Sequence, residues 1–204
     1  MEFRLIYEGE LLPSGGSNTR ASEKHAIRKA FHPQLRRLWT INPSLGSFAD
    51  QHCVGQDRGR PKPERIISGL QNYGKKWNRA GFDLVPLVTA DMVLRCSLDI
   101  QLLRPEEDRF IFQRGDVDGQ LKTLFDALRL PNNAGETGNA TAGADEIPLF
   151  CLLEDDRLIT EVHVVTDQLL LLPNQRQVKA NDVHVVIHVR LNHRNPRAFD
   201  NYFG

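Results

Sequence analysis

Residues 90–130 change their hydrophobic period, and this change decides what the chain can fold into. In ADMVLRCSLDIQLL (90–103), apolar residues from Met92 to Leu102 alternate with mostly polar neighbours. A period of two is typical of a strand with one face on a core. In DGQLKTLFDALRL (118–130), leucine and phenylalanine recur three and four residues apart, which is typical of an amphipathic helix. The chain therefore needs both a sheet and helices that cover it.

Shorter patterns supply the remaining elements. Alternation predicts further strands, and helical spacing predicts two helices before residue 80: strands at 2–8, 156–166 and 182–191, and helices at about 22–39 and 66–77. Turn-rich residues 42–63 predict a long loop, and the Gly/Ala/Asn/Thr-rich residues 131–148 predict a mobile loop. The leucines of 169–172 are expected to cover a sheet edge or a partner subunit. The sum predicts an α/β (α+β) fold, a small mixed sheet of about four strands with helices packed on it.

Composition excludes several classes of protein. The chain has 204 residues, of which 40% are hydrophobic and 25% charged, as is ordinary for one globular domain. It begins without a leader pattern, and its apolar runs are too short to span a bilayer. Cys53, Cys96 and Cys151 lack the spacing of a zinc site or a disulfide framework. We expect a cytoplasmic protein without membrane segments.

The net charge of zero conceals two oppositely charged halves. Residues 20–79 contain thirteen Lys/Arg and four Asp/Glu, a balance of plus nine. Residues 82–182 contain nine Lys/Arg and eighteen Asp/Glu, a balance of minus nine. A basic half favours a polyanionic partner and an acidic half favours cations, although solvated helix faces would give the same counts.

Acidic residues gather where a strand leads into a helix. In RGDVDGQLKTLFDALR (114–129), Asp116 and Asp118 can converge, and Lys122 follows one helical turn later. A strand opened by EDDRLI (154–159) would add Asp155 or Asp156. Carboxylates without His or Cys suit Mg²⁺ or Mn²⁺, which activate phosphodiesters, while a lysine offsets phosphorane charge or orients the attacking water.

Structural readings of the same residues stay open. Asp118 is also a good helix N-cap, and Asp155 with Asp156 is a common turn before a strand. We interpret His184, His188 and Arg190 as the polar outward face of a strand rather than as metal ligands. For the aromatic residues at helical spacing, core packing is favoured over base stacking: Trp39, Tyr73 and Trp77.

At these acidic residues the sequence resembles the RusA family of Holliday junction resolvases, which are common in bacteria and prophages. The resemblance rests on Asp116, Asp118, Lys122 and the DAL of 126–128, then on the DD of 155–156 before a strand. It implies a single RusA-like domain over 1–204, with insertions at about 42–81 and 130–153. It also implies a homodimer that uses Mg²⁺ or Mn²⁺ to nick four-way DNA junctions in recombination and repair.

The resemblance also assigns roles to individual residues. Asp116, Asp118 and Asp156 would bind the metal with Asp155 as a helper, and Lys122 would be the catalytic lysine. Basic residues would contact DNA, and we expect them to include these seven: Asn18, Arg20, Lys24, Arg28, Lys29, Lys75 and Lys76.

One departure from the family pattern separates two hypotheses. Gly119 stands where the family usually has Asn. The leading hypothesis is a metal-dependent, structure-selective DNA endonuclease. The alternative is a DNA-binding relative of weakened or lost activity, and a phosphohydrolase of small phosphoesters is a third, weaker hypothesis.

Overall fold

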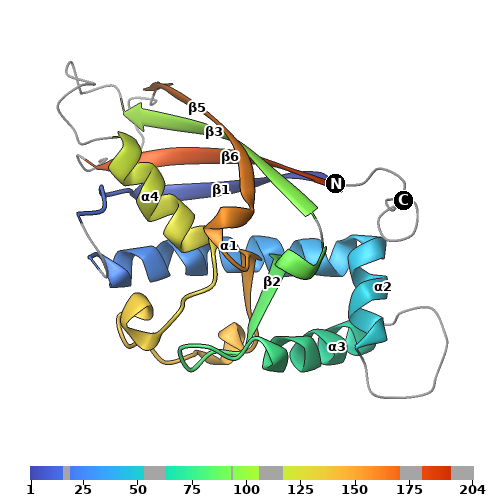
Figure 1. Ribbon diagram of the computed structural model, residues 1–204. Helices are drawn as coiled ribbons and strands as arrows, with labels where there is room; N and C mark the ends of the chain where they lie inside the picture. Colours follow the sequence, from blue (N-terminus) through green and yellow to red (C-terminus); the bar gives the residue numbers. More distant parts are fainter. Residues whose placement is uncertain (16–18, 53–62, 93, 106–116, 171–180, 194–204) are drawn as a thin grey trace.

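The computed structural model describes residues 1–15, 19–52, 63–92, 94–105, 117–170 and 181–193. These residues form a mixed α+β structure, which confirms the predicted fold class (Figure 1). The helices are α1 (Ala21–Ile41), α2 (Pro43–Gln51), α3 (Pro63–Lys76) and α4 (Val117–Leu128). The strands are β1 (Glu2–Glu10), β2 (Leu84–Val88), β3 (Leu94–Pro105), β4 (Leu149–Leu153), β5 (Ile159–Leu169) and β6 (Asp182–His193). Short 3₁₀ turns are η1 (Ala90–Met92), η2 (Ala134–Thr137), η3 (Ala144–Glu146) and η4 (Asp156–Leu158).

The larger sheet has four strands in the order β1-β6-β3-β5. Strand β6 is antiparallel to both β1 and β3, while β3 and β5 are parallel. Alternation in β6 buries five of its six apolar side chains against the helices: Val183, Val185, Ile187, Val189 and Leu191. The strands that were predicted from their period of two therefore form one sheet.

Helix α1 lies between this sheet and the rest of the molecule (Figure 1). Its Ile27, Phe31, Leu35 and Trp39 are buried and belong to the main core. A proline inside a helix commonly kinks or interrupts it, and α1 contains Pro33. The helix instead continues through Pro33 as one element of 21 residues.

The second sheet was not predicted. Strands β2 and β4 pair in parallel, and every residue of both is buried. A strand buried on both faces has no alternation that a period of two could reveal. Helix α2, which lies within the loop predicted at 42–63, begins after Asn42, whose Oδ1 accepts the N–H groups of Ser44 and Leu45 (both 3.1 Å).

The segment predicted as a mobile loop is folded against α1 and α4. Arg129 Nη1 lies 2.9 Å from Glu136 Oε2, and Lys29 pairs with Glu146. Asn133 caps η2, in which Thr137 is buried. The prediction was wrong because ion pairs and capping bonds hold this segment in place, and hydropathy does not register them.

Among the described residues, no helix has both the length and the apolar character that a membrane span requires.

Candidate functional site

Helix α4 carries two of the predicted catalytic residues on its exposed side. Asp118 lies in the first turn, and Lys122 follows one turn later. Both are exposed, and Lys122 makes no hydrogen bond or ion pair within the part of the chain that the structure describes. Asp116 lies outside the described residues. Helix α4 thus presents a carboxylate and an ammonium group to solvent.

The second acidic group lies at η4, between β4 and β5. Asp155 Oδ1 accepts the N–H of Arg157 (3.0 Å), and the Asp155 carboxylate pairs with the Arg157 guanidinium at 2.8 and 3.1 Å. These bonds lower the pKa of Asp155 to about 2. Partial burial raises the pKa of Asp156, with Asp155 and Asp126 adding to the effect and Arg129 opposing it. Neighbouring carboxyl groups whose pKa values are pushed apart are typical of acid–base sites and also of ion-pair networks.

The two acidic groups lie along α4, but they do not converge. Turn η4 packs against α4, and Asp156 interacts electrostatically with Asp126 and Arg129 near the end of that helix. Asp118 comes eight residues before Asp126 on α4, which separates the two residues by about 12 Å along the helix axis at ~1.5 Å per residue. The described residues contain no group of three acidic, His or Cys side chains placed to hold a metal. The predicted convergence of Asp118 with Asp156 is therefore not found.

The described carboxylates are suitable ligands for a divalent metal by their chemistry, but not by their positions. Carboxylates suit Mg²⁺, which is commonly held by one or two carboxylates and several waters. Asp118, Asp155 and Asp156, however, do not form a three-carboxylate site, and both oxygens of Asp155 are bonded to Arg157. The described carboxylates therefore do not supply a complete ligand set for a metal.

Lys24 joins α1 to α4 instead of facing solvent. Its Nζ lies 2.7 Å from Asp126 Oδ2, and Arg129 Nη2 lies 3.0 Å from Asp126 Oδ1. Only 8% of the Lys24 side chain and 17% of the Asp126 side chain are exposed. Lys24, which was expected to contact DNA, is therefore buried, and its ammonium group neutralises a carboxylate of the neighbouring helix.

Arg28 is the second correction to the predicted DNA-binding face. Its side chain is buried, with a relative exposure of 1%. Nη2 donates to the carbonyl of Asp126 (2.7 Å) and Nε donates to the carbonyl of Arg129 (3.1 Å). Carbonyl groups at the end of a helix lack intrahelical partners and carry partial negative charge. Arg28 therefore caps the end of α4.

The other predicted DNA-binding residues are at the surface or outside the described residues. Lys75 and Lys76 are exposed in the last turn of α3, and Lys29 is exposed beside Glu146. Arg20 is partly buried, and its Nε donates to the carbonyl of Pro13 (2.8 Å). Asn18 lies outside the described residues. Their contact with DNA remains a prediction.

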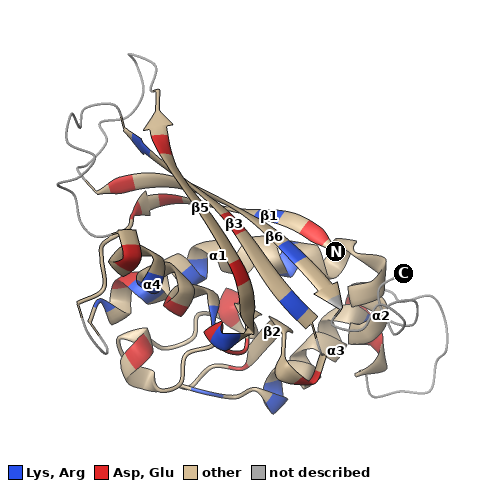
Figure 2. Cartoon of the chain, turned by 45° about the horizontal axis from the view of Figure 1, so that its top comes forward, with Lys and Arg blue, Asp and Glu red and all other residues tan. Residues whose placement is uncertain are grey.

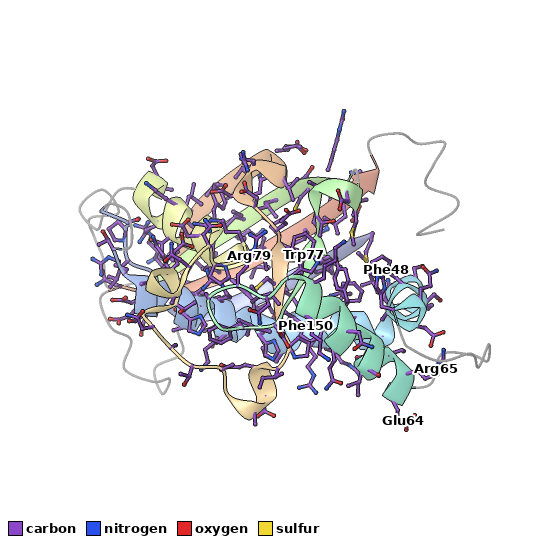
Figure 3. All side chains as sticks on the ribbon, turned by 60° about the horizontal axis from the view of Figure 1, so that its bottom comes forward. Phe48, Glu64, Arg65, Trp77, Arg79 and Phe150 are labelled. Carbon is purple, nitrogen blue, oxygen red and sulfur yellow. The ribbon has the colours of Figure 1, made fainter. Side chains whose placement is uncertain are left out.

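The sequence did not predict the cluster of Lys76, Trp77 and Arg79 at the end of α3. Lys76 Nζ and Arg79 Cζ each lie 5.7 Å from the centre of the Trp77 ring. Figure 3 shows Trp77 and Arg79 next to each other. Trp77 is partly buried against the core, while Trp39 and Tyr73 are fully packed in it, as predicted. The signal in the sequence was KKWNR (75–79), two lysines and an arginine around a tryptophan.

Gly119 accommodates the segment that precedes α1. A Cβ atom at this position would lie 2.9 Å from Pro13 Cβ. The Gly119 carbonyl accepts the N–H of Ser14 (2.9 Å), and the hydroxyl of Thr123 donates to the carbonyl of Leu12 (2.8 Å). The resemblance would imply Asn at this position. Residues 12–14 pack so closely on α4 that an Asn side chain at position 119 would collide with Pro13.

The face of the large sheet opposite the helices is mainly acidic, with histidines between the acids. His163 Nδ1 lies 3.2 Å from Asp99 Oδ1, His184 Nδ1 lies 2.9 Å from Glu8 Oε1, and His188 Nε2 lies 3.2 Å from Glu2 Oε2. Figure 2 shows acidic segments along these strands. The interpretation of His184 and His188 as a polar strand face is confirmed. A phosphate backbone would be repelled from this face.

No family model, curated protein or solved structure with which the chain was compared matches it.

Proposed function

We propose that the chain is a Mg²⁺- or Mn²⁺-dependent, structure-selective DNA endonuclease that acts on four-way junctions as a homodimer. The observation that carries the proposal is the packing of η4 against α4. This contact places Asp155 and Asp156 along the helix that carries Asp118 and Lys122, although the two segments are distant in sequence. The resemblance to the RusA family supplies the substrate class.

The charge distribution supports a nucleic-acid substrate. Lys76 and Arg79 lie over Trp77 at the end of α3, where Lys75 is also exposed. Arg36 and Arg37 are exposed on α1. Lysine and arginine side chains bind phosphates, and an aromatic ring among them can stack on an unpaired base. A small phosphoester would not require such separate basic surfaces, which disfavours the phosphohydrolase hypothesis.

The test is cleavage of a synthetic four-way junction in Mg²⁺ or Mn²⁺, with a linear duplex of the same sequence as the competing substrate. We expect nicks in the junction and few in the duplex. Asp118→Asn should abolish the nicks and leave junction binding within about two-fold. Asp145→Asn removes a carboxylate remote from α4 and serves as the matched control, which should cleave normally. Junction binding without cleavage in either metal would refute the enzyme.

The second candidate is a junction-binding relative that no longer cuts. Two observations favour it: Gly119 packs beneath Pro13, and the described carboxylates do not form a three-ligand group. Calorimetry distinguishes the candidates without DNA. Binding of Mn²⁺ that is lost in Asp118→Asn or Asp156→Asn supports the nuclease, whereas no heat of Mn²⁺ binding to the intact chain supports the inactive relative.

A further inference from the structure

The two edges of the large sheet differ in whether their backbone groups are already bonded. At the β1 edge, the Ile6 N–H donates to Gln34 Oε1 (2.9 Å), and Gln34 Nε2 donates to the Ile6 carbonyl (2.7 Å). The Gln34 amide, which comes from α1, thus occupies the positions that another strand would use. Charged side chains on β1 further blunt this edge.

The β5 edge has no such cover within the described residues. Strand β5 pairs with β3 alone, and its sequence ITEVHVVTDQL contains no Pro or Lys. Its formally charged residues are two acids, Glu161 and Asp167. Val162 and Val165 are each 41% exposed. A long edge strand with exposed valines is a template for pairing with another strand.

We propose that two copies of the chain pair through β5, antiparallel, about a twofold axis that passes beside Val165. The axis is perpendicular to the sheet, so each face of one four-stranded sheet continues into the same face of the other. Because directly opposed residues share a face, only registers centred on a residue are compatible with this symmetry.

Charge selects the register among those centred near the middle of β5. Centring on Val164 places Glu161 opposite Asp167 of the second copy, two like charges. Centring on His163 places the two His163 residues opposite each other. Centring on Val165 places each His163 opposite Asp167 of the second copy, and like charges directly opposed are destabilising whereas unlike charges are favourable.

The side chains of this register have capacity for the new contact. His163 is exposed and uses Nδ1 toward Asp99, which leaves Nε2 for a partner. Asp167 Oδ1 accepts the N–H of Gln168 (2.8 Å), which leaves Oδ2. Because both ring nitrogens would then face carboxylates, the contact requires the imidazolium form of His163, in which Nδ1 donates to Asp99 and Nε2 donates to Oδ2 of Asp167 of the second copy, twice by symmetry.

The open face also contains a row of three apolar side chains, with Gln101 between the second and the third, that this register would extend. Strand pairing aligns Ile6 with Val186, Val186 with Gln101, and Gln101 with Val165. Ile6 and Val165 are both exposed. With Val165 beside the axis, the row would continue into the same row of the second copy.

This inference rests on the homodimer in the proposed function and assigns its interface. The axis lies toward the ends of β3 and β5 near which α4 begins (Figure 1). Asp156 lies in η4, before the first residue of β5, and that first residue, Ile159, is six residues and about 20 Å from Val165 at ~3.3 Å per residue. The two Asp118 residues would therefore lie nearer the axis than the two Asp156 residues.

Cysteine cross-linking tests the register. In Val165→Cys the two thiols face each other across the axis, where opposed Cα atoms lie about 4.5–5.5 Å apart, within the reach of a disulfide. We expect a covalent dimer under mild oxidation. Val162→Cys is the matched control, because its two copies lie about 20 Å apart, six residues at ~3.3 Å. The unsubstituted chain reports any cross-linking through Cys53, Cys96 or Cys151. Cross-linking that peaks elsewhere along β5, or a chain that sediments as a monomer, overturns the proposal.

A charge exchange tests the paired side chains by sedimentation. His163→Glu places two carboxylates opposite each other and should weaken the dimer at least ten-fold. Adding Asp167→Lys restores unlike charges and should recover most of the affinity. Equal affinity in all three chains overturns the contact. Melting curves confirm that the variants are folded.

Neither experiment requires DNA or metal, so their outcomes are separate from that of the proposed nuclease. A junction nuclease that dimerises elsewhere would cleave without a Val165 cross-link. An inactive relative with this interface would cross-link without cleaving.

Discussion

Replacing Arg28 by Met should destabilise the protein strongly and leave the electrostatics of DNA binding unchanged. The Arg28 guanidinium donates to two carbonyls at the end of α4, and its Nη1 lies 3.3 Å from His25 Nδ1. Methionine fills similar space but donates nothing. The carbonyls of Asp126 and Arg129 would then lose these bonds in a buried position.

The magnitude follows from the number and kind of bonds. Hydrogen bonds that involve a charged group contribute about 1.5–3 kcal/mol each, so the loss of two corresponds to roughly 3–6 kcal/mol. For a chain of this length, each kcal/mol lowers the melting temperature by about 2–4 °C. We expect Arg28→Met to melt about 10 °C below the parent chain.

The assay combines melting with the salt dependence of junction binding. Each phosphate contact contributes about 0.9 to the slope of log K against log salt concentration. Arg36→Met, on the exposed side of the same helix, is the matched control. It should change stability by less than about 0.5 kcal/mol.

Both variants are compared at a temperature where each is folded. We expect an unchanged salt slope for Arg28→Met, because its guanidinium is buried at the end of α4. An Arg28→Met chain that melts like the parent while its salt slope falls by about 0.9 would refute it, because Arg28 would then contact phosphate.

Three further substitutions test the account elsewhere. Gly119→Asn should destabilise by about 1–3 kcal/mol in urea unfolding, because its Cβ would lie 2.9 Å from Pro13 Cβ. Burial lowers the pKa of His25 from 6.5 to about 4, so the unfolded chain binds a proton first and stability should fall from pH 6.5 to 4. His25→Gln should remove about 2–3 kcal/mol of that fall. Lys75→Gln with Lys76→Gln should reduce the salt slope of junction binding by about 1–2 at unchanged stability.

Each of these has a control or a contradicting outcome. Gly143→Ala introduces a Cβ with only ordinary contacts, at 3.6 Å or more, and should be nearly neutral. A His25→Gln chain with the same pH dependence as the parent would show that His25 is not the titrating group. An unchanged salt slope in the lysine variant would remove the end of α3 from the DNA surface.

The sequence predicted the elements that are buried on one side. Strand β6 alternates because the helices cover only one of its faces, and β3 alternates for the same reason. Strands β2 and β4 were missed because both faces are buried and every residue is apolar or proline. Alternation of apolar and polar residues appears only in a strand that has one face on the core and one face in solvent. Strands β2 and β4 have no solvent face.

The sequence predicted which segments contribute to the candidate site, but it did not predict where along α4 they meet. EDDRLI was expected beside the helix of Asp118, and η4 does pack against α4. The position of that contact along α4 depends on β4 and the segment folded on α1, which local patterns do not encode. Lys24 and Arg28 were placed on the wrong face because their partners, Asp126 and Arg129, are about a hundred residues away in sequence.

The central claim is that carboxylates of α4 and η4 bind the metal of a phosphodiesterase. Crystals soaked in Mn²⁺ test it most directly, since the anomalous signal locates the ion and its ligands without assuming activity. The account predicts a peak within about 2.0–2.6 Å of carboxylate oxygens that include Asp118 or Asp156. Saturating Mn²⁺ with no peak along α4 and η4 would contradict it.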